Sequence, residues 1–184
     1  MSQTNGRWYE SAIQTFWHRA LVAVIALVLL MTPAQAADNA AELAGLFMQS
    51  CVAFVGDREG LRGWVARNHL TPLPPAGQSA FLGGQAGVAY DATNNEGKFV
   101  VLSGDDGSCS AIAEHAKPQE LISRFEQDLR DSGLPVLVTE EGDDPVDRAL
   151  HHRSYRAGRR IFVVSTAAGG GEGPAMVTAT AVSP

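Results

Sequence analysis

Strand-like runs and tight turns alternate in the stretch VAYDATNNEGKFVVLSGDDGSCSAIAE, residues 88–114. Asparagine, aspartate and glycine gather at residues 94–97, and aspartate and glycine again at residues 104–107; these residue types tolerate the positive φ angles that tight hairpins need. The runs between the turns are rich in β-branched and other apolar residues, which favour strands. The stretch therefore predicts a three-stranded antiparallel β-meander, with strands at residues 88–93, 98–103 and 108–114.

A helix is predicted before this meander, over residues 40–54. One face of that helix carries apolar residues at steps of four, four and three: Leu43, Phe47, Cys51 and Phe54. This spacing is typical of the buried side of an amphipathic helix. A second, shorter helix is predicted to follow, with Asp57 as its N-cap and Arg67 near its end.

Residues 70–87 predict an irregular segment that leads from these helices to the meander. The segment contains three prolines and four glycines, which interrupt both helices and strands. Phe81 and Leu82 are apolar neighbours within it, and we expect both to pack into the core.

The clearest helix lies after the meander, between Pro118 and Gly133. Proline suits a first helical turn, and glycine suits the position just past a helix end. Glu126 belongs to the charged, solvent-facing side, and the inner side consists of Leu121, Ile122, Phe125 and Leu129. Four more strands are predicted near residues 136–140, 150–156, 160–166 and 175–182. The predicted fold class is α+β: N-terminal helices, an antiparallel β-meander, one central helix and a second β-meander.

The N-terminus predicts an export signal over residues 1–36, which leaves residues 37–184 as a single exported domain. An unbroken apolar run spans residues 20–31 and is followed by Ala34-Gln35-Ala36, the small-x-small pattern of a cleavage site. Twelve apolar residues are fewer than the roughly twenty that cross a bilayer core. Cleavage after Ala36 is the prediction, with a retained signal anchor as the alternative.

Two cysteines, Cys51 and Cys109, both lie in the exported part. In an oxidising compartment two such thiols form a disulfide, which here would close a loop of about 58 residues and pin the first helix to the meander. A reactive or metal-binding thiol is the alternative. Neither cysteine has a second cysteine or a histidine within four residues, and the chain has no zinc-type spacing, so no metal site is predicted.

The chain is acidic, with 14 Lys and Arg against 20 Asp and Glu and a formal net charge of −6. An acidic protein repels nucleic acid and anionic lipid unless it carries a local basic patch. Neither nucleic acid nor a membrane surface is therefore the expected partner.

One strongly basic stretch interrupts this acidic composition at residues 148–160, which contain five arginines and two histidines. Side chains alternate between faces along a strand, so His151, Arg153 and Tyr155 are predicted on one side and His152, Ser154 and Arg156 on the other. Guanidinium groups bind planar anions, which makes a phosphate, carboxylate or acidic sugar a candidate ligand. The candidate ligand-binding residues are His151, His152, Arg153, Tyr155 and Arg156.

A structural interpretation of the same stretch needs no ligand. An acidic run precedes it, and its members are Glu140, Glu141, Asp143, Asp144 and Asp147. The arginines of a solvated hairpin would then face these carboxylates.

Three short segments resemble small exported proteins of proteobacteria that have no assigned role. They are Leu46 to Cys51 (LFMQSC), Ala80 to Gly84 (AFLGG) and Gly107 to Cys109 (GSC), and the likeness covers most of residues 43–113. The resemblance implies export and one disulfide, and it transfers no catalytic residue.

Recognisable catalytic signatures are absent from the sequence. It contains no G-x-S-x-G, H-E-x-x-H or G-x-x-x-x-G-K-[ST] motif, and no cofactor is predicted. The leading hypothesis is a non-enzymatic periplasmic or secreted binding, inhibitor or assembly protein with an envelope protein as partner. The alternative is an envelope enzyme or carrier that acts on a small anionic ligand through the hairpin of residues 151–160.

Overall fold

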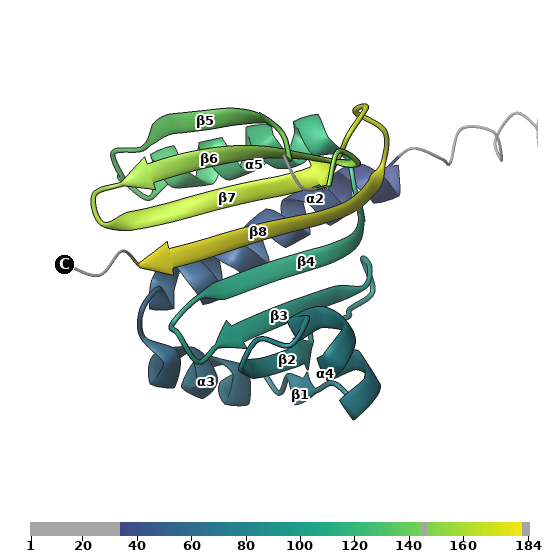
Figure 1. Ribbon diagram of the computed structural model, residues 1–184, viewed down its shortest axis with the longest axis vertical. Coiled ribbons are helices and arrows are strands. Elements are labelled where there is room, and N and C mark those ends of the chain that lie inside the picture. Colours follow the sequence, from purple (N-terminus) through teal and green to yellow (C-terminus); the bar gives the residue numbers. More distant parts are fainter. Residues whose placement is uncertain (1–33, 145–146, 182–184) are drawn as a thin grey trace, which may run out of the picture. The chain divides into compact units, whose positions relative to one another are not determined.

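The computed structural model describes residues 34–144 and 147–181 of the chain, and the predicted export signal at residues 1–36 lies almost wholly outside them. In chain order the elements are α2 (Ala34–Phe47), the π-helical turn η1 (Met48–Val52), α3 (Arg58–Arg67), β1 (Thr71–Pro72), α4 (Pro75–Leu82), β2 (Gly87–Asp91), β3 (Phe99–Gly104), β4 (Cys109–Ala116), α5 (Pro118–Asp131), β5 (Leu137–Asp143), β6 (Leu150–Ala157), β7 (Arg160–Ala167) and β8 (Gly173–Ala181) (Figure 1). The predicted α+β class is confirmed. Within the described ranges, no helix is both long and apolar enough to cross a membrane.

All eight strands form one antiparallel sheet in the order β1-β2-β3-β4-β8-β7-β6-β5. The two predicted meanders are its halves, and their last strands, β4 and β8, pair at the centre (Figure 1). Their register runs from Cys109 opposite Ala179 to Ala113 opposite Ala175. The sheet therefore has two ends, β1 and β5, and these edges differ in length.

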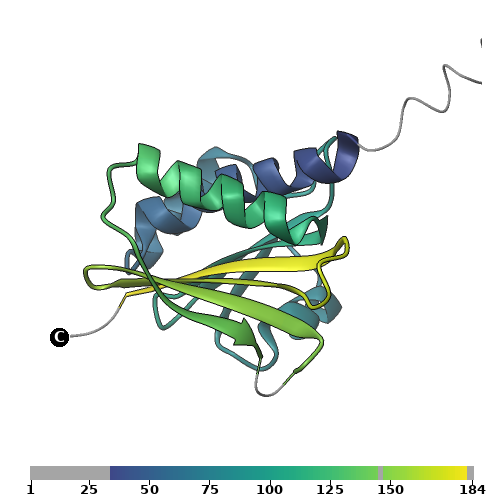
Figure 2. The ribbon, with the colours of Figure 1, turned by 90° about the horizontal axis from the view of Figure 1, so that it is seen from above.

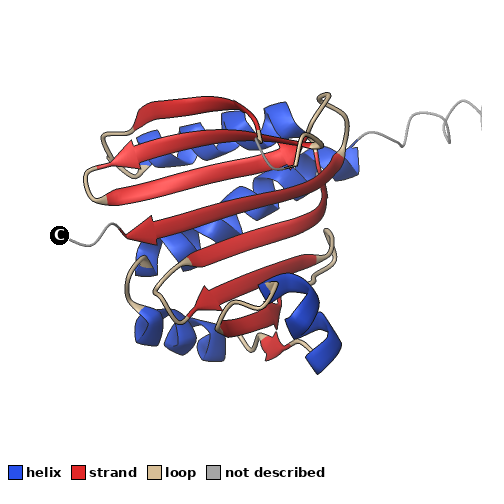
Figure 3. Cartoon of the chain, viewed as in Figure 1, coloured by secondary structure: helices blue, strands red, loops and turns tan. Residues whose placement is uncertain are grey.

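The helices lie on both faces of the sheet, but unequally. Figure 2 shows α2 and α5 side by side on one face, and Figure 3 shows α4 on the other face, in front of the strands. The core fills the space beneath α2 and α5. Its largest buried side chains include four aromatic rings that meet edge to face, from Phe47, Phe125, Tyr155 and Phe162. The ring centroids of Phe47 and Phe125 lie 5.5 Å apart, so the first helix and the central helix contact each other directly over the sheet.

The predicted first helix is confirmed, and it carries the disulfide. Its apolar face is buried at Leu43, Phe47 and Cys51, as the spacing of these residues predicts. Cys51 lies in η1 and is bonded to Cys109 at the start of β4, with 5.2 Å between the two Cα atoms. The bond fixes the end of this helix to the central part of the sheet.

The second helix also begins where the sequence predicts. The Asp57 side chain accepts a hydrogen bond of 2.9 Å from the Gly60 amide, which makes it the N-cap of α3. Leu61 and Val65 are buried beneath the helix.

The prediction for residues 70–87 is wrong in two respects. The segment contains a short strand, β1, and a two-turn helix, α4, because Pro75 occupies a first helical position and Gly83 ends the helix in the left-handed conformation, with φ of 57°. Phe81 does not enter the core but is 41% exposed, and Leu82 is only half-buried. The reason is that α4 lies on the face of the sheet opposite the core.

A single glutamine ties α4 to the sheet. β1 is only two residues long, so the Ala89 amide of β2 extends past its ladder, while the Ala89 carbonyl accepts a hydrogen bond of 2.9 Å from the Leu73 amide. The Gln78 side chain supplies the missing partner: its Oε1 accepts from the Ala89 amide at 2.8 Å, and its Nε2 donates to the Ala89 carbonyl at 2.7 Å. The same Nε2 lies 3.0 Å from the Leu73 carbonyl. Gln78 thus closes the β1 edge of the sheet, because its amide occupies the place of a strand backbone.

We expect Gln78→Ala to expose the Ala89 amide. An unsatisfied backbone group costs about 1–3 kcal/mol, and about 1.4 kcal/mol corresponds to a tenfold change in an opening equilibrium. Hydrogen exchange of the Ala89 amide should therefore accelerate about tenfold or more, as measured by NMR. The neighbouring variant Ser79→Ala is the control and should leave that amide protected; equal exchange in both variants would contradict the role given to Gln78.

The double variant Cys51→Ala with Cys109→Ala should lose about 4 kcal/mol of unfolding free energy, because a cross-link of this span restricts the unfolded chain. Urea denaturation measures the loss. Reducing agent should destabilise the wild-type protein by a similar amount and leave the double variant unchanged. A loss below about 1 kcal/mol would show that the disulfide does little to restrict the unfolded chain.

Candidate functional site

The predicted basic hairpin is formed by β6 and β7, and its side chains alternate as the sequence predicts. β6 runs between β5 and β7, so both of its long sides are paired. Arg153 and Tyr155 point to the face covered by α5, where both contact Glu126 of that helix. His152 and Arg156, each one strand position away from these residues, belong to the opposite face.

Acidic residues of β5 face three of the predicted ligand-binding residues. His151 Nδ1 lies 3.3 Å from Asp143 Oδ1, and Arg153 Nη1 lies 3.2 Å from Glu141 Oε2. On the other face, His152 Nε2 lies 3.6 Å from an oxygen of Glu140. These contacts are the ones that the structural interpretation of the basic stretch predicts, since opposite charges meet across the β5–β6 ladder.

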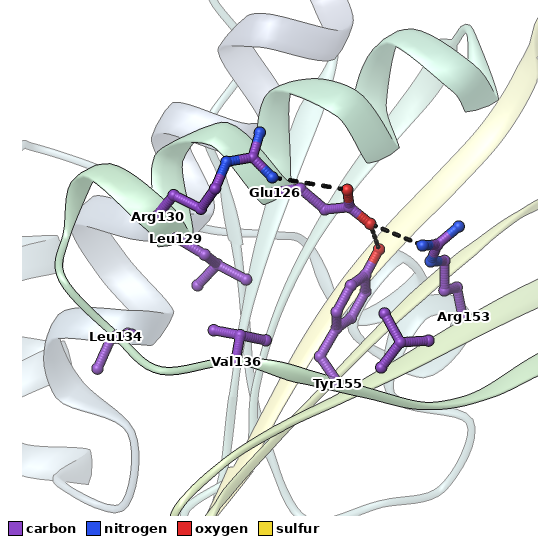
Figure 4. Close-up of a pocket in the computed structure, with 8 residues that line it drawn as sticks. Glu126, Leu129, Arg130, Leu134, Val136, Arg153 and Tyr155 are labelled. Atoms are coloured by element: carbon purple, nitrogen blue, oxygen red, sulfur yellow. Dashed lines mark hydrogen bonds and ion pairs between the residues drawn. The ribbon is translucent and has the colours of Figure 1, made fainter.

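A pocket of about 240 Å³ opens between α5 and the strands β5 and β6 (Figure 4). The apolar wall of the pocket consists of Leu129, Leu134, Val136 and Val138. Its polar side consists of Glu126, Arg130, Arg153 and Tyr155. Arg153 and Tyr155 are the two predicted ligand-binding residues that reach this pocket. His151, His152 and Arg156 do not line it.

Glu126 is the centre of the polar side of the pocket, as the converging dashed lines in Figure 4 show. One carboxylate oxygen accepts a hydrogen bond of 3.0 Å from the Tyr155 hydroxyl and lies 3.0 Å from Arg153 Nη2. The other oxygen lies 3.9 Å from Arg130 Nη1. Since Arg153 also pairs with Glu141, this one arginine joins the central helix to the strand β5.

The sequence places Glu126 on the solvent side of its helix, and its role at the pocket is missed. Its side chain is 26% exposed, because it bends over the sheet toward Tyr155, 29 positions further along the chain. The local sequence offers only the pairing with Arg130 one turn later.

The Tyr155 ring is buried and its hydroxyl is held as a hydrogen-bond donor. Burial, and then the negative charge and hydrogen bond of Glu126, raise the pKa of Tyr155 far above its usual value. The guanidinium of Arg153 lies 5.8 Å from the centroid of the same ring. The pocket therefore holds a neutral phenol beside two arginines whose charge is offset by Glu126 and Glu141, so it presents little excess positive charge to an anion.

The other arginines of the basic stretch do not converge on this pocket. Arg148 is exposed in the turn before β6, Arg156 is exposed on the opposite face of the sheet, and Arg159 and Arg160 lie at the tip of the β6–β7 hairpin. The predicted cluster is thus divided between two faces and a hairpin tip.

Beside the pocket, β5 forms the long edge of the sheet. Among the described strands only β6 pairs with it, so its outer backbone groups have no strand partner there. Its first two residues are apolar and exposed, with Leu137 70% and Val138 49% accessible. Its second half is acidic, and the Glu140 side chain is 70% exposed. The edge is therefore apolar at the pocket and negatively charged further along.

No match to this chain was found among models of protein families, among curated proteins or among solved structures. Nowhere in the described part of the chain do three or more His, Cys, Asp or Glu side chains gather in a way that could hold a metal ion.

The variant Tyr155→Phe tests the hydrogen bond to Glu126. At neutral pH we expect it to lower the unfolding free energy by about 1 kcal/mol. In the wild-type protein, that free energy should fall as the pH rises above about 10, because tyrosine ionises there in the unfolded chain but stays protonated in the folded one. Urea denaturation at about pH 9 and about pH 11 measures this fall, which should shrink in the variant.

Tyr90→Phe provides the control, since Tyr90 is the other tyrosine of the described residues. The fall in unfolding free energy between the two pH values should be larger in Tyr90→Phe than in Tyr155→Phe. A slope that is the same in Tyr155→Phe and in the wild type would rule out Tyr155 as its source.

Proposed function

We propose that this protein is a non-enzymatic binding protein, exported to the periplasm or beyond, which holds an extended segment of an envelope protein along the edge strand β5. The observation that supports the proposal is the division of this edge into an apolar half beside a pocket and an acidic half. Binding, inhibition and assembly each need an exposed contact surface, and none of them needs a catalytic group.

The backbone of β5 favours a partner in extended conformation. An unpaired strand edge offers a row of N–H and C=O groups to which another chain adds as a further strand. The opposite edge of the sheet is short and is closed by Pro72 and Gln78. β5, with seven residues, is the edge at which strand addition is open.

The side chains of β5 specify the chemistry of that partner. Leu137 and Val138 lie at one end, where Val138 is also part of the pocket wall, so an apolar side chain of the partner fits there. Glu140 and Asp143, whose side chains are 70% and 72% exposed, lie at the other end and suit lysine or arginine, whereas Glu141 already pairs with Arg153. The net charge of −6 favours encounter with a basic segment.

A second copy of this chain fits the edge poorly. If two β5 strands paired antiparallel about their centre, Glu140 of each copy would face Glu140 of the other, and Leu137 would face Asp143. Like charges directly opposite each other destabilise a sheet.

The alternative function is an envelope enzyme or carrier that binds a small anion through residues 151–160. It has weaker support, because His151 and Arg153 already contact carboxylates that an anion would have to displace. Arg156, which is exposed, is the residue on which that alternative depends most.

A synthetic nine-residue peptide provides the test. It carries lysines in one half and valine and leucine in the other, and a second peptide has glutamates in place of the lysines. We expect the full-length protein to bind the lysine peptide, and Glu140→Lys to weaken binding about fivefold to tenfold because attraction becomes repulsion. Fluorescence anisotropy measures the affinity, and NMR shifts should locate the peptide at residues 137–143.

Glu96→Lys is the matched control, since Glu96 is an exposed residue of the β2–β3 turn and the net charge changes equally. Equal affinities of the two variants, or equal binding of the two peptides, would refute strand addition at β5. Binding of inorganic phosphate that is lost in Arg156→Glu would instead favour the alternative.

A further inference from the structure

A second cavity, of about 380 Å³, lies on the other face of the sheet, beside α4. Its lining comes from the α4 region, the strands β2 to β4 and the start of β8: Leu73, Phe81, Asp91, Thr93, Lys98, Phe99, Val100, Ile112, Ala113, Glu114 and Pro174. Ligand cavities in proteins begin at about 300 Å³, so a small molecule fits this volume.

The α4 wall of this cavity is apolar and uncovered. No residue of α4 is buried, although Phe81 and Leu82 end the helix. Phe81 lines the cavity and is 41% exposed, so a ligand there would remove a large apolar surface from water. Gln78 holds the helix in place over β2, which keeps this wall formed without a ligand.

The floor of the cavity is the sheet itself. Val100 of β3 and Ile112 of β4 are directly opposite each other in the ladder and both line the cavity. Ile112 is only half-buried, and among the described elements only α4 lies on this face. The floor therefore offers the half-buried Ile112 side chain to a ligand, with the largely buried Val100 beside it.

The rim of the cavity carries one unneutralised negative charge. Lys98 Nζ and Glu114 Oε2 lie 2.9 Å apart and neutralise each other. Asp91 accepts a hydrogen bond of 2.9 Å from the Thr93 amide, and no lysine or arginine of the described residues pairs with it. The hydrogen bonds from Thr93 also lower the pKa of Asp91, so its carboxylate is charged at neutral pH.

We propose that this cavity binds a small amphiphilic amine, whose apolar body packs against Phe81, Val100 and Ile112 and whose ammonium group lies beside Asp91. Charge complementarity favours an amine, because the rim charge that no lysine or arginine of the described residues neutralises is the carboxylate of Asp91. The site lies near the β1 edge of the sheet and is separate from the β5 edge, so it does not depend on the function proposed there.

Two indole compounds of opposite charge test this proposal. Tryptamine and indole-3-propionate share the ring and differ in the charge of the side-chain end. NMR titration of the full-length protein should give saturable shifts with tryptamine at residues 73–82, 91–93 and 112–114. Indole-3-propionate should bind about tenfold more weakly, because its carboxylate faces Asp91.

Substitutions test the apolar wall and the carboxylate of the cavity separately. Phe81→Ala should weaken tryptamine binding about fivefold or more, and it should fold normally because Phe81 is not a core residue. Asp91→Asn should remove most of the preference for tryptamine. Leu137→Ala removes an exposed apolar side chain at the β5 edge and should leave tryptamine binding unchanged.

Three results would overturn the proposal. The first is the absence of saturable shifts around Phe81 with tryptamine. The second is equal affinity for the two indoles in the wild-type protein, which would leave the cavity without the proposed amine selectivity. The third is a loss of binding in Leu137→Ala equal to that in Phe81→Ala.

Discussion

The pairing of β4 with β8 is the constraint on which the rest of the structure depends. It joins two halves of four strands each into one sheet wide enough to carry both α2 and α5. Six helix-facing residues of these two strands are buried, and most of them are small: Cys109, Ala111, Ala113, Ala175, Val177 and Ala179. Small side chains at the centre of the sheet leave room above it, and the rings of Phe47, Phe125 and Phe162 fill that room. On the opposite face the same two strands are joined by a hydrogen bond of 2.9 Å between Ser110 and Thr178.

Much of the fold is predictable because its signals are local. The step pattern of Leu43, Phe47 and Cys51 defines a helix face within a dozen residues, and the turns at residues 94–97 and 104–107 define two hairpins. The junction of β4 and β8 has no such signal, because it joins residues far apart in the sequence, from Cys109 opposite Ala179 to Ala116 opposite Gly173, and alanine has little preference for strands. α4 is missed for another reason: prolines and glycines that interrupt a helix also begin and end one, and only the structure tells these cases apart.

In the candidate site, too, the local features are predictable and the long-range contacts are not. The alternation of His151, Arg153 and Tyr155 follows from the geometry of a single strand and is predicted correctly. The hydrogen bond between Tyr155 and Glu126 depends on how α5 lies over the sheet, and strand periodicity does not predict that placement. The acidic partners of the histidines can be predicted, because the sequence has a run of carboxylates just before them. The exposure of Leu137 and Val138 cannot, because it depends on β5 being an edge strand of the sheet.

The position of β8 has a consequence for the order in which the fold is completed. β8 is the last strand of the described chain to be synthesised, yet it occupies the centre of the sheet between β4 and β7. Until it arrives, the first meander and the β5–β7 meander lack their shared partner, and β4 and β7 each present an open side. Completion of the sheet thus has to wait until residues 173–181 have been synthesised, and contacts of such long sequence separation make folding slow. Removal of β8 would therefore not remove an edge strand. It would separate β4 from β7 and split the sheet into two parts.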